Sequence, residues 1–423
     1  MARGLLRSKD VRLITLAVGL SAMGDWLALA PLGLHLADST GSGFALAALM
    51  ASLWAPSVLL ARPAGRLVDR VEARALLICV SLAQAAVAAG LAFVSGTAAI
   101  LALTTLIGTG FALAQPAEFA LIPAICRSRR GSEKPETELQ AANGLVEFAR
   151  YAGFSLGPAL GGLLAAMGSA KLALLANAVT FLAVAAFGLV IRARRMPDRA
   201  AAAASPGAEA GGEGGFGALF ADRSLATLMI VAFFSLLFMT SNWAAMPFFA
   251  TGDLDAGATG YGVLLSCWTL GMAIGALGAA PRVPIGALVT VALGATAVQG
   301  AGLGAPAILP FLPLAFLAFF AGGFSHGLKN TLVRTAIGIR VPRQMHGRAF
   351  ASFNALRNGA ELIALLGGAL MVSWADARVT VLLAGLLSMT VALVGLAVHR
   401  RPSPKSEPAS ATFSAPALGE IAA

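Results

Sequence analysis

Five charged residues lie inside long apolar stretches of this sequence, where they can carry protons or form ion pairs. Asp25 lies about fourteen residues into an apolar run near the N-terminus. Glu147 and Arg150 are three positions apart, and Arg357 and Glu361 are four apart, so each pair shares one face of a helix. A buried carboxylate can bind and release a proton. An ion pair stays neutral as a whole until a proton separates its partners.

These residues also allow a structural interpretation, in which Asp25 bonds to a neighbouring helix and the two pairs are static. A charged side chain at the centre of a bilayer costs at least about 2.5–3.5 kcal/mol on insertion scales, so we treat all five as candidates for proton coupling. His326 and Lys329 are weaker candidates. A histidine on an apolar face is usually satisfied within the core, and a lysine can extend to the membrane interface.

The composition excludes several classes of protein. Of the 423 residues, 58% are hydrophobic and 12% are charged, whereas soluble domains contain about 25% charged residues. An ordinary soluble enzyme, a disordered chain, collagen and a coiled coil are therefore excluded. Neither G-x-x-x-x-G-K-[ST] nor H-E-x-x-H occurs, so we expect neither enzymatic activity nor a cofactor. Cys79, Cys126 and Cys267 lie far apart without a C-x-x-C spacing, which predicts no metal site and no disulfide framework.

Apolar runs bounded by glycine, proline or charge predict twelve membrane-spanning helices. They cover about residues 11–36, 44–62, 75–94, 98–122, 140–166, 172–191, 225–250, 261–280, 284–304, 308–333, 349–373 and 379–398. An even number of spans places both termini on one side. Of the 30 Lys and Arg residues, 25 lie in the N-terminus, alternate loops and C-terminal tail, which predicts cytoplasmic termini in the inner membrane. The net charge of +10 thus reflects topology, and nucleic acid is not an expected partner.

The spans divide into two pseudo-symmetric halves of an all-α membrane protein. We expect a six-helix half over 1–191, a flexible cytoplasmic linker over 192–223, a second half over 224–400 and a disordered tail over 401–423. At a shift of about 217 residues, Gly24-Asp25-Trp26 meets Ser241-Asn242-Trp243. Duplicated halves of this kind are typical of transporters that bind substrate near the midplane. The first apolar run is too long for a signal peptide, so we expect an uncleaved span.

The loop after the second span contains a recognisable motif. Gly65, Asp69, Arg70 and Arg74 stand in the order G-x-x-x-D-R-x-x-x-R, which resembles the G-x-x-x-D-R-x-G-R-R loop of the major facilitator superfamily. The resemblance implies a cytoplasmic gate, in which the glycine permits close helix contact and the acid faces a helix N-terminus. In that family an acid at the position of Glu118 can meet an arginine of this loop, and the alternative for Glu118 is a solvated helix end. The alternative is an ordinary basic loop that obeys the charge rule.

The fifth span carries a second motif of small residues. It consists of Gly144, Gly153, Gly157, Pro158, Gly161 and Gly162. This pattern resembles the antiporter motif of drug:proton exporters in the same superfamily, and the resemblance implies efflux rather than uptake. Glycines four residues apart permit tight helix packing, and proline introduces a kink. The alternative is a small-residue packing helix without directional meaning.

Further short matches favour one branch of that superfamily. Ala141-Ala-Asn143-Gly144 and Gly347-Arg348-Ala349 resemble macrolide-efflux and siderophore exporters. Pro116-Ala117-Glu118-Phe119 also resembles a stretch of lysophospholipid transporters, which keeps a lipid substrate open. Many drug:proton antiporters carry an arginine in the fourth span, and here Thr104 and Leu106 stand at the corresponding positions. Arg150 would then have to take over its part in coupling.

These observations together predict a proton-coupled exporter of a hydrophobic or amphipathic small molecule, acting as a monomer in the lipid bilayer. Aromatic and polar residues are expected to line its substrate cavity. They are Trp26, Phe111, Phe234, Phe238, Asn242 and Trp243. The alternatives are a lysophospholipid flippase or sodium-coupled carrier of the same fold, and a membrane receptor or scaffold that does not transport.

Overall fold

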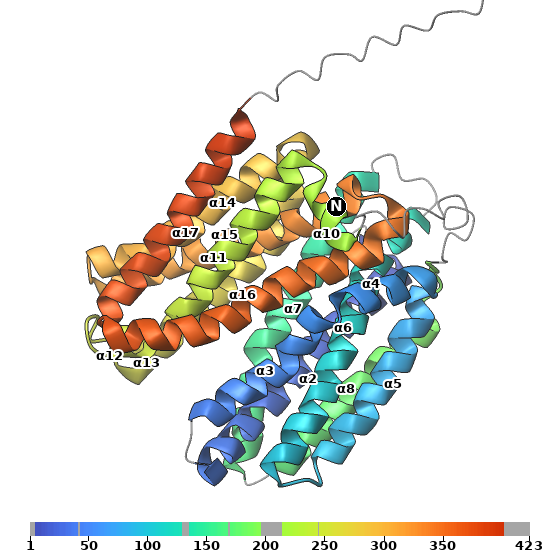
Figure 1. The fold of residues 1–423 in the computed structure, drawn as a ribbon, viewed down its shortest axis with the longest axis horizontal. Coiled ribbons are helices and arrows are strands. Elements are labelled where there is room, and N and C mark those ends of the chain that lie inside the picture. The colour runs from blue at the N-terminus through green and yellow to red at the C-terminus, as the bar shows by residue number, and fades with distance from the viewer. Residues whose placement is uncertain are drawn as a thin grey trace, which may run out of the picture.

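The structure, a computed structural model, is a bundle of helices. It describes residues 5–40, 43–128, 135–167, 170–195, 214–243 and 245–401, and these residues contain no strand. Most of the expected linker and the tail from residue 402 onward lie outside the described residues. Within the described part, the helices form twelve spans in two groups of six (Figure 1). The predicted twelve-helix, two-half membrane fold is therefore confirmed.

The N-terminal half is built from six spans, one of which is broken. In chain order they are α2 (Lys9–Thr40), α3 (Gly43–Leu59) with α4 (Ala61–Arg70), α5 (Ala73–Leu91), α6 (Thr97–Ser128), α7 (Pro135–Ala166) and α8 (Ala170–Val190). The second span bends by 60° between α3 and α4. Pro63 explains the break, because its ring lacks an N–H for the carbonyl of Leu59 and would clash with it in a continuous helix.

The C-terminal half repeats this arrangement. Its spans are α11 (Arg223–Asn242) followed by the short α12 (Met246–Thr251), α13 (Gly257–Ile274) continued by η1 (Gly275–Ala279) and η2 (Ala280–Arg282), α14 (Leu288–Ile308), α15 (Leu312–Arg340), α16 (His346–Trp374) and α17 (Ala377–Arg400). A further short helix, α10 (Gly215–Phe220), lies within the expected linker and packs on α16. The start of the linker is also held in place, because Asp10 accepts hydrogen bonds from the backbone of Arg192 and Ala193 at 3.2 and 2.8 Å.

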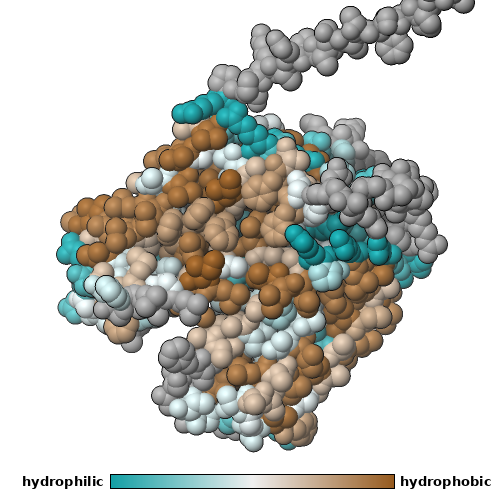
Figure 2. Space-filling model, in the orientation of Figure 1, coloured by the Kyte–Doolittle hydropathy of each residue, from teal (hydrophilic) through white to brown (hydrophobic). Residues whose placement is uncertain are grey.

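The charged side chains inside the bundle lie mainly on three helices. Among the described residues, eight helices are individually long and apolar enough to cross a membrane, and the bent α3–α4 pair makes a ninth. The remaining spans are α7, α15 and α16, which carry most of the interior charges. Figure 2 shows apolar side chains spread over the outer surface of the bundle. The spans that are too polar to face lipid on all sides thus depend on their neighbours for cover.

Three glycines of the small-residue motif form a contact face between α7 and α2. A Cβ on Gly153 would lie 2.5 Å from the carbonyl oxygen of Gly19, and one on Gly157 would lie 2.6 Å from that of Met23. Gly161 meets the next turn of α2 in the same way. The absence of side chains at these positions lets the two backbones approach closely, so the contact belongs to the interior of the N-terminal half.

The other members of the motif lie elsewhere. Gly144 faces the opposite half, where its Cβ would lie 2.5 Å from the carbonyl oxygen of Ala276 in η1. Gly162 is exposed, and a Cβ there would have no neighbour within 4 Å. Pro158 lies inside α7, between Gly157 and Gly161. The motif therefore serves two contacts, one within a half and one between the halves.

The two halves meet at the end of the bundle where α2 begins and α17 ends. There α16 packs against α3, α4 and α6, while α7 packs against α13, η1 and α15. At the opposite end, the surface is hollowed between the part formed by α3 and the part formed by α12 and α13 (Figures 1 and 2). The structure is therefore closed at the end with the termini and open at the other.

A pair of glycine variants tests the contact between α7 and α2. Gly157→Leu is expected to lower stability by about 1–3 kcal/mol, because overpacking forces backbone shifts. Gly162→Leu is the matched control, since nothing lies near its Cβ. Thermal unfolding in detergent provides the measurement. Equal midpoints for both variants would show that the close contact contributes nothing.

Candidate functional site

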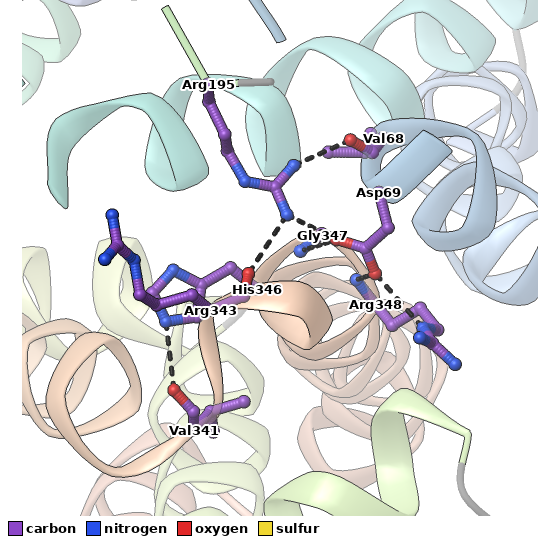
Figure 3. A network of polar contacts seen from close by, with 8 residues as sticks. All are labelled: Val68, Asp69, Arg195, Val341, Arg343, His346, Gly347 and Arg348. Atoms are coloured by element: carbon purple, nitrogen blue, oxygen red, sulfur yellow. Dashed lines mark hydrogen bonds and ion pairs between the residues drawn. The ribbon is translucent and has the colours of Figure 1, made fainter. Parts of the chain in front are cut away.

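The closed end is held by a carboxylate that bridges the two halves. Asp69, near the end of α4, accepts hydrogen bonds from the backbone N–H groups of Gly347 and Arg348 at 2.7 and 3.1 Å. These groups belong to the first turn of α16, where N–H groups lack partners within the helix. The negative charge also suits the positive end of the helix dipole. Gly65, Asp69 and Arg70 lie in helix α4 rather than in the loop that the sequence predicted, so charge-assisted bonds join α4 to α16 (Figure 3).

Two arginines complete this latch. The Arg348 Nε lies 3.1 Å from Asp69 Oδ2, and the Arg195 Nη2 lies 2.6 Å from Asp69 Oδ1. Arg195 also donates to the carbonyl oxygens of Val68 at 2.7 Å and Arg343 at 3.3 Å. Arg195 stands at the start of the expected linker. The linker therefore contributes a side chain to the contact between the halves.

The other residues of the gate motif have supporting positions. A Cβ on Gly65 would lie 2.7 Å from the Arg348 Cα, so glycine permits the close crossing of α4 and α16. Arg74 donates to the carbonyl oxygen of Ile191 at 2.7 Å and pairs with Glu72. Arg70 ends α4. Arg195 and Arg348, which sequence reasoning did not assign to the gate, are the arginines paired with Asp69.

A second group of charges lies deeper in the bundle. The Glu147 carboxylate forms ion pairs with Arg150 at 3.5 Å and with Arg334 of α15. Arg150 also pairs with Glu118 of α6 at 3.6 Å. All four side chains are at least 90% buried. The predicted pair of Glu147 and Arg150 is therefore part of a four-residue network that crosses from one half to the other.

An aromatic ring holds the two cations of this network. The guanidinium carbons of Arg334 and Arg150 lie 4.1 and 5.1 Å from the centre of the Phe119 ring. Cation–π attraction at these distances strengthens when water is excluded. Phe119 also packs against Phe350 of α16, with ring centres 5.5 Å apart. The ring thus stabilises two like charges between the halves.

Two expectations about this region need correction. Glu118 was expected to meet the gate loop, but it lines the central cavity and pairs with Arg150. Its position well inside the long helix α6 explains the difference. Arg334 was counted among loop cations because the apolar run ends at residue 333. The helix α15 continues to Arg340, which carries Arg334 into the core.

Neutral side chains close the same end around the network. Gln140 donates to the carbonyl oxygen of Ala280 at 2.6 Å, and Asn143 donates to Thr335 at 3.0 Å. Both bonds join α7 to the C-terminal half. The seal is therefore polar and specific, as well as tightly packed.

A central cavity of about 1060 Å³, counting its open part, lies above this seal. Its wall contains Asp25, Glu118 and Arg150 from the N-terminal half and the Arg357–Glu361 pair, 3.3 Å apart, from α16. Four large aromatic side chains complete it, namely Trp26, Trp54, Phe111 and Phe154. The candidate coupling residues, Glu147 excepted, thus line a space that also offers apolar area for a ligand.

The structure does not bring every expected cavity residue to this wall. Phe234 and Phe238 stack on each other, with ring centres 6.3 Å apart, and Trp243 is 40% exposed. Asn242 is buried at the end of α11. None of these four lines the central cavity or the smaller cavity between α11, α15 and α16. The pseudo-symmetry between Asp25 and Asn242 therefore does not extend to a shared lining.

Removing one partner of the buried network should be costly. Glu147→Gln and Arg334→Gln are each expected to lower stability by about 3–5 kcal/mol, because each leaves a buried charge unpaired. The double variant should lose less than the sum of the two. The exposed pair of Asp222 and Arg340, 2.7 Å apart, is the control. Arg340→Gln breaks this pair but keeps Asp222 as the N-cap of α11, and it should cost about 0–1 kcal/mol. Strictly additive losses in thermal unfolding would contradict the coupling.

The latch at Asp69 can be tested by distance measurement. Asp69→Asn weakens the bonds to Arg195 and Arg348, so the closed end should separate more often. Spin labels at the exposed Arg66 and Gln344, in a variant without the native cysteines, report this distance. Longer distances are expected for Asp69→Asn and unchanged ones for Glu72→Gln. An unchanged distance for both would show that Asp69 does not hold the gate.

Comparison with solved structures gives the same fold. The human organic anion transporter MFSD10 (TETRAN) superposes with a TM-score of 0.72 at 17% identity, covering 93% of this chain and 99% of the other. FucP in its outward conformation superposes with a TM-score of 0.70 at 14% identity, and the match covers 93% of this chain and 99% of FucP. A bacterial homologue of the iron transporter ferroportin in an outward-facing state superposes with a TM-score of 0.68 at 14% identity. That match covers 92% of this chain and 98% of the homologue.

Sequence comparison supplies the family. No curated protein sequence matches the chain. The sequence model of the Major Facilitator Superfamily matches residues 14–358, which is more than half of the chain. The match includes Asp69, the buried charge network and the lining of the central cavity except Glu361. The protein is a transporter rather than an enzyme, and it belongs to the Major Facilitator Superfamily.

Proposed function

We propose that the protein exports a hydrophobic or amphipathic small molecule across the cytoplasmic membrane in exchange for protons, acting as a monomer. The observation that carries this proposal is the central cavity, in which aromatic walls surround an acid that lacks a full set of partners. The Asp25 Oδ1 atom is buried and has no hydrogen-bond partner among the described residues. A carboxylate in that state gains most from binding a proton.

Asp25 stands beside the charge network that joins the halves. It interacts electrostatically with Glu118 and Arg150, and Arg150 in turn pairs with Glu147, which contacts Arg334. A proton on Asp25 would weaken its attraction for Arg150 and leave that cation more strongly bound to its remaining partners. The proposed coupling is therefore a change in the charge balance around Arg150 that alters the bond between the halves.

The direction of transport follows from the proposed orientation. We place the closed end, with both termini and most basic residues, in the cytoplasm. The cavity then opens outward, where it releases substrate and takes up a proton. Breaking the Asp69 latch and the bond between Glu147 and Arg334 would open the other side. Alternating access also requires that the bonds of Gln140 and Asn143 to the C-terminal half break and that the end now open closes over the cavity.

Everted membrane vesicles test the proposal. With an acidic interior, wild-type vesicles are expected to accumulate a substrate from a panel of dyes, macrolides, siderophores and lysolipids, while protons leave. Asp25→Asn should abolish this proton-driven accumulation, because its amide cannot carry a proton. Asp253→Asn, an exposed acid at the open end, is the matched control and should behave as wild type.

Two results would overturn parts of the proposal. Normal coupled transport by Asp25→Asn would remove Asp25 as the proton carrier. Movement of lysolipids alone, or flux driven by sodium alone, would favour a flippase or a sodium-coupled carrier of the same fold.

A further inference from the structure

A second, smaller cavity, of about 410 Å³ counting its open part, lies in the C-terminal half between α11, α15 and α16. Its polar lining consists of His326, Lys329, Asn330 and Arg357. The rest of the wall is apolar, and it includes Phe233 and Phe353. No acidic side chain stands among the described residues that line it. The cavity therefore combines positive charge with apolar walls.

Lys329 is the central feature of this cavity. The sequence suggested that its side chain reaches the membrane interface, but the residue is only 2% exposed. Its Nζ donates a hydrogen bond of 2.8 Å to Gln299 Oε1. Gln299 is a neutral partner, and among the described residues no carboxylate lies within ion-pair distance of Lys329. An ammonium group has three donors, so two remain for a ligand.

The surrounding side chains fix the direction of Lys329. The Gln299 Oε1 atom that accepts from Lys329 also lies 3.2 Å from His326 Nδ1. The amide nitrogen of Asn330 lies 2.9 Å from His326 Nε2 and 2.9 Å from the hydroxyl of Tyr151, across the boundary between the halves. Asn330 and His326 use their donors within the cluster, so the donors left for a ligand are those of Lys329. Through Tyr151 the cluster also contacts the N-terminal half.

The charges in this region are not balanced by the protein. Arg357 already pairs with Glu361, and Arg334 contacts Glu147. Lys329 is thus the one interior cation, among the described spans, without an acidic partner. A buried, unpaired charge is costly. An anion that enters the cavity would remove this cost.

We propose that the Lys329 cavity binds the carboxylate of an amphipathic substrate, an assignment that rests on the proposed transport function and names the substrate class. Lys329 is the binding residue, and Gln299 and His326 are positioning residues. Arg357 lines both this cavity and the central one. The apolar side chains of the Lys329 cavity, among them Phe233 and Phe353, would then contact the apolar part of the substrate.

Binding of matched probes to the purified full-length protein tests the assignment. The probes are 1-naphthoate, 1-pyrenebutyrate and laurate, each compared with its own methyl ester. At least one carboxylate is expected to bind wild type about tenfold or more tightly than its ester, since hydrogen bonds between two charged groups are among the strongest. Lys329→Gln should remove that preference, whereas Lys329→Arg, which retains the charge, should keep it.

Controls separate this assignment from misfolding and from the proposed function. Lys171→Gln alters a cation that lies against the Phe93 ring, far along the chain from the cavity, and should leave the preference unchanged. If Lys329→Gln does not fold, Lys329→Met, which keeps an unbranched side chain of similar length, replaces it in the same comparison of acids and esters. Esters that bind as tightly as every acid, or a preference that survives Lys329→Gln, would overturn the assignment. The exporter proposal is tested separately. If the esters bind as well as the acids and the vesicles still accumulate substrate as protons leave, the Lys329 assignment fails and the exporter proposal stands.

Discussion

The structure depends on one constraint, which is that charges inside a bilayer must neutralise one another. Glu147 meets this constraint by contacting Arg150 in its own half and Arg334 in the other. The contact that removes the cost of burial is thus also the contact that joins the halves. A protein that must open and close between two states can use such a bond, because a single proton or ligand changes its balance. The helices that carry these charges are covered by more apolar ones.

The closed end is built in layers around this bond. Nearest the termini, Asp69 joins the gate loop to the first turn of α16. Deeper, the charge network and the amides of Gln140 and Asn143 seal the centre. Glycines on α7 make the packing close on both of its sides. These layers are bonds between halves, whereas the α2–α7 contact lies within one half and can persist while the halves move.

The interior charges are distributed unequally. The acids Asp25, Glu118 and Glu147 face one cation in the N-terminal half, and the cations Lys329, Arg334 and Arg357 face one acid in the C-terminal half. The N-terminal half thus has an excess of negative charge and the C-terminal half an excess of positive charge. The bond between Glu147 and Arg334 neutralises one charge of each half. Asp25 and Lys329 are left. A proton would neutralise the first and an anionic group the second, so the two proposals assign one ligand to each remaining charge.

The sequence by itself determined the helices, the two halves and the residues able to carry charge, because these follow from apolar run length and local spacing. It also identified Glu147–Arg150 and Arg357–Glu361, since partners three or four positions apart meet on any helix. Only the tertiary structure decided that Glu118 pairs with Arg150, that Arg334 and Arg195 bridge the halves, and that Lys329 is buried without an acid. Those contacts join residues distant in sequence, and their partners are set by how helices cross rather than by local pattern.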